Sequence, residues 1–523
     1  MLDYDVIVIG SGFGGAVAAC RLAEAGYRVV VLERGRRWRR DEYPSTSKTN
    51  WRWDNDKPHK ANGWFDVRLF KTIATVAGAG VGGGSLHYAN VSINAHETVF
   101  AHGWPAAIKN GGLASYYPKV KDMLGSQKIP ENQLSNRTKL LKEAATSAQI
   151  GRYGEVDLAV RFNPAYAYDA SKESDSRDTV FEANDQGIEQ GFCVHLGQCV
   201  LGCPVEARNT LATNYLPQAE KNGATILPLH IVRTIVPEHG GYRVRYDEIT
   251  GDRLMSGEMT ARKVIVACGS IGSTELLLRC RDQYKTLPRL GPMLGRKWST
   301  NANYLTLATH AHRDVYPTRG PTISGAISFL DGYQGSHFFI EDGGFPDAVD
   351  EFRHRFAQLG GKARRFRTDL EALKHEPGDE LFRHLMLWFA QGQDEPVGAF
   401  RLRKRWLGLW GPPELDLAWD REGARQVLDH IKEVHTILLE RTNGEIFLQP
   451  PHALITPHPL GGCPMGETGK DGVVDHRGEV FGYKHLYVAD GSVVPRPIGN
   501  NPSKTIAALS ERMAAILVSE GDG

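Results

Sequence analysis

Runs of hydrophobic residues at the start of the chain alternate with a segment of small residues. Residues 5–9 (DVIVI) and 29–32 (VVVL) are continuous aliphatic runs, which is typical of parallel strands buried on both faces. Residues 16–25, between them, are mostly alanine and other small or aliphatic residues and predict a helix. The order of strand, helix and strand is typical of an α/β fold.

The same pattern returns further along the chain. Residues 264–267 (VIVA) predict a buried strand that runs into a glycine-containing turn, residues 268–272, and a helix over residues 274–279. Residues 486–489 (LYVA) predict another strand, and a last helix is expected over residues 504–518. These segments extend the α/β pattern to both ends of the chain.

The middle of the chain has a different pattern. Strands are expected over residues 304–309, 336–341 and 415–419, with a charged helical stretch over residues 347–390. Residues 301–450 carry no nucleotide-binding signature. This region is therefore expected to form a separate sheet that covers a substrate site.

Length and composition bound the class of protein. A chain of 523 residues is longer than one hydrophobic core usually serves, so two or more domains are expected. The formal net charge of +1 disfavours non-specific binding to nucleic acid. No stretch reaches the roughly 18 apolar residues of a membrane span, and the N-terminal residues show no secretory pattern. Seven cysteines are too few for a disulfide scaffold, which favours a reducing, cytoplasmic compartment.

A dinucleotide-binding motif follows the first strand. Gly10 allows the tight turn, Gly12 lets the backbone approach a pyrophosphate, and Gly15 lets the helix pack on the strand. The helix N-terminus offers unpaired N–H groups to the phosphates. Glu33 ends the second strand, where it can accept hydrogen bonds from an adenosine ribose. An acid at this position favours FAD or NAD over NADP.

Two further segments indicate a flavin. Residues 78–86 (GAGVGGGSL) form a second glycine-rich segment, whose backbone can press against a flat ring or a diphosphate. Asp490 and Gly491 lie where the strand at residues 486–489 ends, and residues 500–503 open the last helix. An acid beside a helix N-terminus can hold a ribityl chain and stabilise negative charge near the flavin N1–C2 carbonyl.

Five ordered motifs resemble one known family. They are DYDVIVIGSGFGG, GVGGGSL, VIVACGSIGSTELLLR, TPHPLGGCPMG, and LYVADGS with GNNPSKTIAALSER. The chain resembles the glucose-methanol-choline (GMC) oxidoreductases, and within them the cholesterol-oxidase branch most. The resemblance implies an α/β fold, in which a Rossmann-like FAD-binding domain joins a discontinuous substrate domain built on a mostly antiparallel sheet with helices. It also implies oxidation of an alcohol to a carbonyl by hydride transfer to flavin N5.

The implied domains alternate along the chain. Residues 1–118, 191–300 and 451–523 are expected to form the FAD-binding domain. Residues 119–190 are expected to be a lid or substrate-domain segment, and residues 301–450 the substrate-binding domain. No low-complexity linker separates these parts, so the chain must cross between domains several times.

The resemblance also implies the residues of the active site. His458, in the PHPLGG motif, is the implied active-site histidine, and Asn501, in the GNNP motif, is its partner. Glu341, in a segment that precedes a proline, matches the glutamate base of the cholesterol-oxidase branch. Val232 matches a strand residue whose backbone meets the adenine. The implied FAD contacts are Gly10, Gly12, Phe13, Gly14, Gly15, Glu33, Arg34, Gly83, Gly84, Ser85, Asn90, Val91, Val232, Cys268, Gly269, His458, Asp490, Gly491, Asn501, Pro502 and Ser503.

One segment departs from the family pattern. After residues 78–86 the chain reads HYANV, unlike the VNGG of secreted cholesterol oxidases, so flavin contacts at residues 88–91 are expected to differ. No histidine aligns with a covalent attachment site for the flavin, and His87 is the nearest candidate for that role.

The chemistry expected of an alcohol oxidase agrees with these side chains. A neutral imidazole at His458, held in its loop by Pro457 and Pro459, can accept the proton of the alcohol near neutral pH, unless this histidine is purely structural. Asn501 can donate to the substrate oxygen or contact the flavin edge, or it serves only as a helix cap. Glu341 can move a proton between carbon atoms of an enolisable product, or it is an ordinary surface carboxylate.

A cysteine cluster raises the question of a metal. Cys193, Cys199 and Cys203, with His195, supply four side chains of the types that bind zinc. The cluster lacks the second CxxC pair that many structural zinc sites carry. We therefore expect buried thiols and no metal.

Three functions fit the motifs. The first is an FAD-dependent oxidase or dehydrogenase for a bulky hydrophobic alcohol, with a 3-hydroxysteroid as the first choice and oxygen or another electron acceptor as co-substrate. The second keeps the machinery for a terpenoid, aliphatic or sugar-like alcohol and passes the electrons to an acceptor other than oxygen. The third is a flavin- and lipid-binding protein without catalysis. Arginines beside aromatic residues, at residues 352–367 and 401–410, indicate peripheral contact with an anionic membrane, or a solvated lid.

Overall fold

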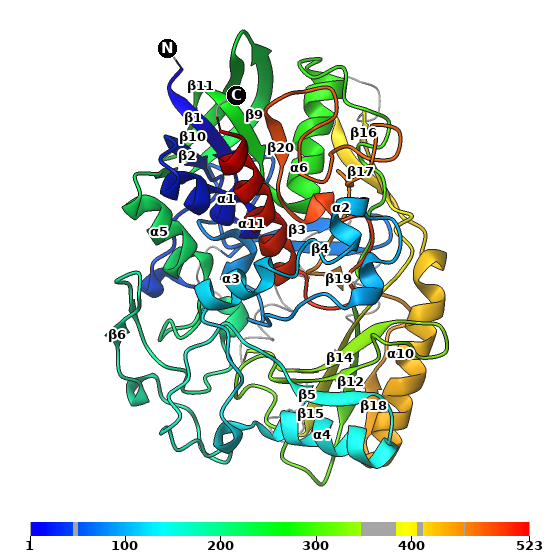
Figure 1. The fold of residues 1–523 in the computed structure, drawn as a ribbon. Coiled ribbons are helices and arrows are strands. Elements are labelled where there is room, and N and C mark those ends of the chain that lie inside the picture. Colours follow the sequence, from blue (N-terminus) through cyan, green and yellow to red (C-terminus); the bar gives the residue numbers. More distant parts are fainter. Residues whose placement is uncertain (1, 45–50, 347–382, 405–411, 454, 522–523) are drawn as a thin grey trace.

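Two β-sheets, one above the other in Figure 1, organise the molecule. The computed structural model describes residues 2–44, 51–346, 383–404, 412–453 and 455–521. The N- and C-terminal ends of the chain both lie beside the upper sheet. Each sheet draws strands from distant parts of the sequence, which confirms the discontinuous α/β architecture predicted above.

The first sheet has parallel strands at its centre. β1 (Tyr4–Ile9) lies between β2 (Val29–Leu32) and β11 (Arg253–Val266), and all three run parallel. β8 (Thr225–Leu227) pairs with β2, and β20 (Leu486–Val488) pairs with β11, again in parallel. The four strands expected from continuous apolar runs are therefore confirmed, because β1, β2, β20 and the end of β11 are buried on both faces.

A long antiparallel extension completes this sheet. β10 (Gly241–Thr250) pairs with β11 on one side and with β9 (His230–Glu238) on the other. The sequence indicates only the start of β9 and the end of β11. The first half of β11 is exposed or partly exposed, and β9 ends in exposed Pro237 and Glu238.

Helices with small side chains cover the parallel strands. α1 (Phe13–Glu24) packs against α11 (Ser503–Glu520) and α5 (Tyr215–Lys221), and α3 (Tyr116–Met123) lies against α11 (Figure 1). A Cβ atom on Gly14 would lie 1.5 Å from the carbonyl oxygen of Ala489, so only glycine lets α1 approach the end of β20. The helices expected over residues 16–25 and 504–518 are confirmed with small shifts at their ends.

The second sheet is antiparallel throughout. Its order is β18 (Glu445–Leu448), β12 (Tyr304–Thr309), β15 (Leu385–Gly392), β14 (Phe338–Gly343), β13 (Gly325–Ser328) and β5 (Arg152–Glu155). α4 (Asn136–Ala148) and α10 (Glu422–Arg441) pack on one face of this sheet (Figure 1). The other face points toward the first sheet and its loops. The antiparallel sheet implied for the substrate domain is therefore confirmed.

Alternation along the strands separates the two faces of the second sheet. Tyr304, Thr306 and Ala308 of β12 are buried on the side of α10, whereas Leu305 and Leu307 are only partly buried. A strand with one partly open face is the wall that a substrate cavity needs.

Smaller elements connect the two sheets. Two of them are helices, α2 (Ala106–Lys109) and α6 (Gly269–Leu278), and α6 continues into a π-helical turn at Arg279–Gln283. A three-stranded sheet consists of β3 (Phe65–Leu69), β4 (Ala74–Gly78) and β19 (Ile455–Thr456). Two further pairs of strands are β16 (Ala399–Arg403) with β17 (Glu414–Ala418), and β6 (Glu182–Ala183) with β7 (Glu189–Gln190). The division into five alternating domain segments stays a prediction.

Two expectations for the middle region are wrong. The helical stretch expected over residues 347–390 is wrong at its C-terminal end, because Leu385–Gly392 is an inner strand of the second sheet. Its run of apolar residues fits a buried strand as well as a helix, since periodicity alone does not separate the two. The strand expected at residues 415–419 exists as β17, but it pairs only with β16 and does not join the substrate-site sheet. Residues 347–382 lie outside the described part of the chain.

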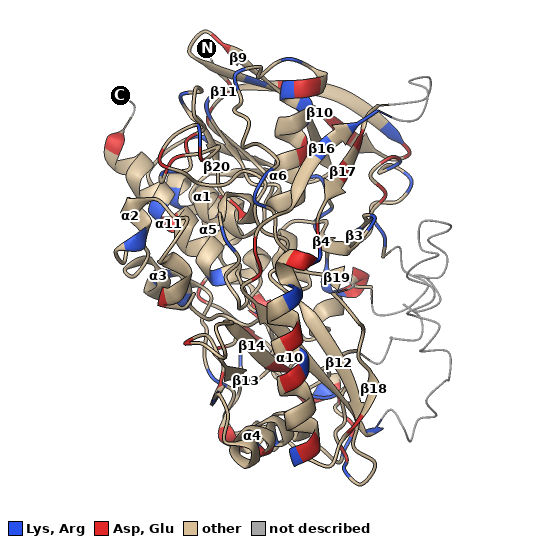
Figure 2. Ribbon diagram, turned by 90° about the vertical axis from the view of Figure 1, so that its right-hand side faces the viewer, with Lys and Arg blue, Asp and Glu red and all other residues tan. Residues whose placement is uncertain are grey.

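Lysine and arginine positions are interspersed with aspartate and glutamate positions along the ribbon in Figure 2. Arg401, the first residue of a basic segment considered for membrane contact, pairs with Asp416 across β16 and β17. Among the described residues, no helix combines the length and hydropathy needed to cross a bilayer. Peripheral membrane contact stays a prediction, and residues 352–367 and 405–410 lie outside the described part of the chain.

Candidate functional site

The first glycine-rich turn leaves open space where a diphosphate is expected. Gly10 has φ +99°, and a Cβ atom there would lie 2.4 Å from the carbonyl oxygen of Ala267. A Cβ atom on Gly12 would meet no atom within 4 Å. Gly83, from the second glycine-rich segment, packs so closely that its own Cβ atom would lie 2.6 Å from Gly12 Cα. The two glycine-rich segments therefore meet beside an open surface of backbone at the N-terminus of α1.

Ser11 links these segments to the acid at the end of β2, and sequence reasoning missed it. The Ser11 backbone N–H and hydroxyl donate to Glu33 Oε2 at 3.0 Å and 2.7 Å. The Ser11 hydroxyl oxygen accepts from the Gly82 N–H at 3.0 Å, and Glu33 Oε1 accepts from the Gly35 N–H at 2.9 Å. Glu33 is thus buried and held by donors, with lone pairs left for a ribose. The sequence could have indicated this role, because Ser11 is the residue between Gly10 and Gly12 in the glycine-rich motif.

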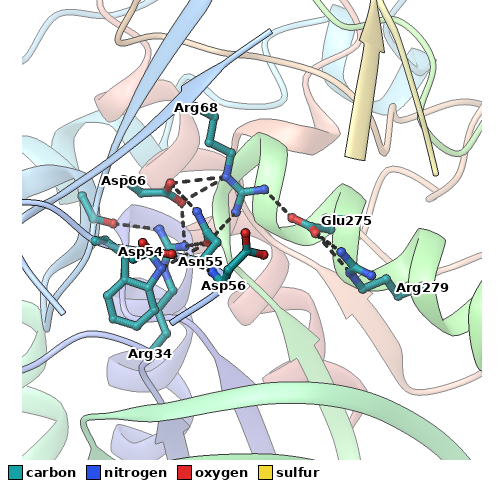
Figure 3. Close-up of polar contacts among 10 residues, drawn as sticks. Arg34, Asp54, Asn55, Asp56, Asp66, Arg68, Glu275 and Arg279 are labelled. Atoms are coloured by element: carbon teal, nitrogen blue, oxygen red, sulfur yellow. Dashed lines mark hydrogen bonds and ion pairs between the residues drawn. The ribbon is translucent and has the colours of Figure 1, made fainter. Parts of the chain in front are cut away.

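Arg34, expected to contact the cofactor, belongs to an ion-pair network (Figure 3). Its guanidinium donates to Asp66 Oδ2 at 2.7 Å and lies over the Trp53 ring. Asn55 donates to the other oxygen of Asp66 at 2.8 Å. The side chain of Arg34 is therefore fixed beside Glu33 at the nucleotide end of the fold, with its charge already paired.

The network continues to α6 (Figure 3). Arg68 pairs with Asp66 and with Glu275, and Arg279 donates to Glu275 at 2.6 Å. Burial alone would raise the pKa of Asp66, but the adjacent Arg68 and Arg34 charges outweigh it and hold the pKa at about 2. Asp66 is therefore charged at neutral pH, and the network ties β3 to α6 across the nucleotide end.

The segment after the second glycine-rich turn holds an amide without partners. Asn90 has φ +65°, is fully buried, and neither its Oδ1 nor its Nδ2 makes a hydrogen bond with a described residue. Buried amides almost always have partners. The donor and acceptor edge of an isoalloxazine ring would supply both. Ser85, also expected at the flavin, instead donates to the Gly82 carbonyl and accepts from the Leu211 N–H, so its hydroxyl shapes the turn.

Asp490 joins the ends of β11 and β20. It accepts from the Gly269 N–H at 2.9 Å and from the Ser492 N–H at 2.8 Å, and the Ser273 hydroxyl also donates to it. Burial raises the pKa of Asp490, and these hydrogen bonds oppose the rise. A Cβ atom on Gly269 would meet nothing within 4 Å, so the N-terminus of α6 also faces open space.

The other expected cofactor residues lie around the same openings. Phe13 and Gly15 belong to the first turn of α1, Gly84 lies against Phe13, and Cys268 precedes α6. The first residue of β9, His230, donates its N–H to the Glu33 carbonyl, which places Val232 two residues further along that strand. Gly491 follows Asp490, Pro502 precedes α11, and the Ser503 hydroxyl donates to the Val91 carbonyl.

His458 lies at the junction of the two sheets. Its Nδ1 is 3.1 Å from the side-chain amide of Asn303, and its ring centroid is 6.3 Å from that of Phe389 on β15. Burial lowers the pKa of His458 to about 3, and the neighbouring His87 also disfavours its charged form. The imidazole is therefore neutral at neutral pH, in the form that can accept a proton.

Glu341 is not a surface carboxylate, because it is fully buried in β14. Its Oε2 accepts from Gln391 Nε2 at 2.8 Å, whereas Oε1 makes no hydrogen bond with a described residue. Burial raises the pKa of Glu341 to about 8 and the Asp342 charge adds to the rise, while the side-chain amides of Gln391 and Asn501 oppose it. The carboxyl is mostly protonated at neutral pH.

Strand register places Glu341 in a row with apolar residues. Glu341 pairs directly with Ala326 on β13 and with Phe389 on β15, and Phe389 pairs with Leu305 on β12. Directly paired residues project from the same face of a sheet. One polar group thus stands among three apolar ones on the face that looks toward His458 and Asn501.

A short segment before β12 connects these groups, and sequence reasoning missed it. Asn301 and Ala302 have φ +55° and +40°, a conformation that costs about 1–3 kcal/mol at each non-glycine residue. The carboxylate of Asp394 accepts from the N–H groups of Thr300 and Ala302 and stabilises this turn. Nothing in the sequence marks the segment, because its turn depends on a residue more than ninety positions away.

Asn301 orients the opposite side of the site. Its oxygen accepts from the N–H groups of Ile498 and Gly499, and its nitrogen donates to the Asn500 carbonyl at 2.9 Å. The same nitrogen lies 3.2 Å from Gln391 Oε1, so the nitrogen of Gln391 must be the end that donates to Glu341. Asn301 thereby holds both the loop that carries Asn501 and the partner of Glu341.

The cysteine cluster contains buried thiols. Burial raises the pKa of Cys193 and of Cys203, and His195 stacks on Tyr168 with ring centroids 3.9 Å apart. Among the described residues, no group of three or more acidic, cysteine or histidine side chains is placed to hold a metal ion.

These observations fit FAD. Each part of this cofactor has a matching feature: open backbone at Gly12 for the diphosphate, the buried acid Glu33 for the ribose, the unpartnered amide of Asn90 for the flavin, and Asp490 at the open N-terminus of α6. The groups that can hold or move a proton, His458 and Glu341, contact Asn303 and Gln391 of the second sheet and the segment before it.

Comparison with known proteins agrees with this geometry. A family model described as GMC oxidoreductase matches residues 4–281, and a second with the same description matches residues 398–510. A cholesterol oxidase of Acinetobacter baumannii is 30% identical over 98% of this chain and 93% of its own length. One from Mycobacterium tuberculosis is 31% identical over 99% and 92%. The solved structure of a fungal aryl-alcohol oxidase has a TM-score of 0.63 at 17% identity, and the match covers 99% of both chains, which shows a shared fold.

Proposed function

This chain belongs to the GMC oxidoreductase family and is an FAD-dependent oxidoreductase acting on alcohols, and we propose that its substrate is a bulky hydrophobic alcohol of the 3-hydroxysteroid class. The observation that carries the proposal is the row of Ala326, Phe389 and Leu305 beside Glu341. A flat apolar substrate gains free energy by covering such a wall. The cholesterol oxidases named above are consistent with this substrate class.

His458 is the proposed acceptor of the hydroxyl proton. Because its pKa is lowered to about 3, the imidazole stays neutral across the physiological range and needs no prior loss of a proton. Asn501 Oδ1 makes no hydrogen bond with a described residue, so the amide has capacity left for the substrate oxygen or the flavin edge. When bound, FAD supplies the acceptor for the substrate hydride.

Glu341 is proposed to act after the oxidation. With a pKa of about 8, a minor fraction of this carboxyl is ionised at neutral pH. The ionised form can take a proton from the carbon next to the new carbonyl and return the same proton to another carbon, which shifts the double bond and leaves the carboxylate unchanged. Its Oε1, free of partners among the described residues, is the atom that would carry the proton.

An anaerobic substrate screen tests the proposal. The FAD-loaded protein is mixed with 3-hydroxysteroids and, in parallel, with terpenoid, aliphatic and sugar-like alcohols, and the visible flavin absorbance is followed. We expect 3-hydroxysteroids to bleach the flavin fastest, and the ketone to be recovered. Faster bleaching by one of the other alcohols would transfer the proposal to that class, and no bleaching by any alcohol would contradict it. Subsequent addition of oxygen shows whether oxygen is an electron acceptor.

A further inference from the structure

Asn303 lies between the side chain of His458 and the hydroxyl of Thr456, whose other hydrogen-bonding partners are backbone groups. The nitrogen end of its amide faces His458 Nδ1 at 3.1 Å, and the oxygen end faces Thr456 Oγ1 at 2.7 Å. Asn303 is 1% exposed and directly precedes β12, so it has little room to move. Because the two ends of an amide have the same shape, their hydrogen-bonding partners decide which end faces which neighbour.

The hydroxyl of Thr456 determines the orientation of the Asn303 amide, because it has a single proton to donate. The Thr300 carbonyl, 2.8 Å away, can only accept, and the His458 backbone N–H, 3.0 Å away, can only donate. The hydroxyl therefore donates to Thr300 and accepts from His458, and its second lone pair needs another donor. With the Asn303 oxygen in that place, two buried oxygens would compete for one proton, and one would lose its donor. Only with the Asn303 nitrogen facing Thr456 do the Thr456 hydroxyl, the Thr300 carbonyl and the His458 N–H all have a hydrogen-bonding partner.

We propose that Asn303 presents its nitrogen to Thr456 and its oxygen to His458, and is thereby a positioning residue that fixes the tautomer of His458. The imidazole Nδ1 then carries the proton and donates to the Asn303 oxygen. Nε2 keeps its lone pair and is the atom that accepts the proton of the substrate hydroxyl. The inference rests on the proposed function, because a free lone pair on Nε2 matters only if His458 is the proton acceptor.

The tautomer can be measured directly in the FAD-loaded wild-type protein. Histidine labelled with ¹⁵N gives long-range ¹H–¹⁵N correlations whose pattern separates the two neutral tautomers, and a His458→Asn protein identifies the signals of His458 among the 19 histidines. We expect Nδ1 protonated and Nε2 bare. A protonated Nε2 in the wild-type protein would overturn the inference.

Substitutions at Thr456 test whether the hydroxyl orients the amide. Thr456→Ser keeps the hydroxyl and should keep the Nδ1-protonated form. Thr456→Val fills the space of the side chain without a hydroxyl, so the amide can turn and the Nε2-protonated form should appear. We expect kcat to fall at least about tenfold in Thr456→Val and to change little in Thr456→Ser, since the wrong tautomer of a catalytic histidine blocks proton transfer. Equal tautomers in the two variants would contradict the role of Thr456.

Substitutions at Asn303 test whether its side chain fixes the tautomer of His458. A carboxylate can only accept, so Asn303→Asp should keep Nδ1 protonated, whereas Asn303→Leu removes the partner and should let the proton move to Nε2. We expect the loss in kcat to be larger for Asn303→Leu, with KM changed less than kcat. A purely structural Asn303 would leave the tautomer unchanged in both variants and would overturn the inference.

Failure of this inference and failure of the proposed function are distinguishable. A protein that oxidises 3-hydroxysteroids while its His458 carries the proton on Nε2 contradicts only the inference. A protein that shows the expected tautomer and oxidises no alcohol contradicts only the proposed function.

Discussion

Burial sets the protonation of the two titratable side chains proposed for catalysis. Burial moves the pKa of His458 down to about 3 and that of Glu341 up to about 8, so both side chains are mostly neutral at neutral pH. Neutral groups beside apolar side chains suit a hydrophobic substrate, because no charge must be desolvated when it binds.

Removal of the imidazole tests the role of His458. We expect His458→Ala to stay folded and yellow and to lose about two to four orders of magnitude in kcat, the usual contribution of a general base. Steady-state turnover and the ratio of flavin absorbance to protein absorbance measure the two effects separately. Unchanged turnover would show that another group accepts the proton.

Gly12 offers a test of the cofactor site that leaves the fold intact. Its backbone has φ −71° and ψ −171°, which any residue can adopt, and a Cβ atom there meets no atom within 4 Å. Gly12→Val should therefore fold normally, yet place methyl groups where the diphosphate is expected. We predict a protein with wild-type circular dichroism that binds FAD at least about a hundredfold more weakly, a loss of roughly 2.7 kcal/mol.

A matched control exists in β5. A Cβ atom on Gly154 also meets nothing within 4 Å, so Gly154→Ala should leave FAD affinity unchanged. Titration of both apoproteins with FAD, followed by flavin fluorescence, compares them. Wild-type affinity in Gly12→Val would place the diphosphate elsewhere.

Among the elements, the segment from Thr300 to Asn303 has the largest effect on the site for its size. Asn301 fixes the loop before Asn501 and orients Gln391, and Asn303 contacts His458. The segment therefore sets the relative positions of three groups that come from different parts of the chain. A shift of about 1 Å in such a group can cost about a hundredfold in rate.

Asn301→Gly separates this positioning from backbone strain. Glycine adopts φ +55° freely, so the variant removes the hydrogen bonds of the side chain without adding strain. We expect kcat to fall about ten- to a hundredfold. Asn443→Gly is the matched control, because Asn443 has φ +53°, is exposed and lies in the turn after α10, far from these contacts along the chain. Equal kcat in the two variants would contradict the role of Asn301.

The sequence predicts elements best where the pattern is local. The four buried parallel strands and the helices α1 and α11 follow from apolar runs and glycine turns, and the family motifs predict His458, Asn501 and Glu341 as site residues. The apolar run at residues 385–390 falls in the stretch expected to be helical, because a run without alternation fits either a helix or a buried strand. The sequence does not reveal the roles of Asn301, Asn303 and Gln391, because these roles depend on neighbours distant in the sequence.

Across the whole molecule, the candidate site lies where loops of the first sheet meet the open face of the second. Neither sheet alone supplies the site, because His458 follows β19 of the three-stranded sheet, Asn501 shortly precedes α11, and Glu341 and Phe389 belong to the second sheet. The unfolding of the protein should therefore report on buried groups at this junction.

Glu341 gives the stability of the molecule a pH dependence with a definite sign. A carboxyl with a pKa of about 8 in the folded protein and about 4.3 in the unfolded chain takes up a proton on folding between these values. The free energy of unfolding therefore falls as the pH rises through this window. We expect Glu341→Gln, which cannot ionise, to lose less stability than the wild type between about pH 6 and pH 9 in urea denaturation. A parallel decline in both proteins would contradict the raised pKa.

The central claim is that an alcohol binds between the two sheets with its oxygen at His458 and Asn501, beside a bound flavin. A crystal structure of the FAD-loaded protein with a 3-ketosteroid product tests it most directly. The account predicts the steroid rings against Leu305 and Phe389, the ketone oxygen within hydrogen-bonding distance of the Asn501 amide nitrogen, and His458 Nε2 beside the carbonyl carbon and oxygen. A steroid bound elsewhere, or a flavin whose reactive face is turned away from His458, would contradict it.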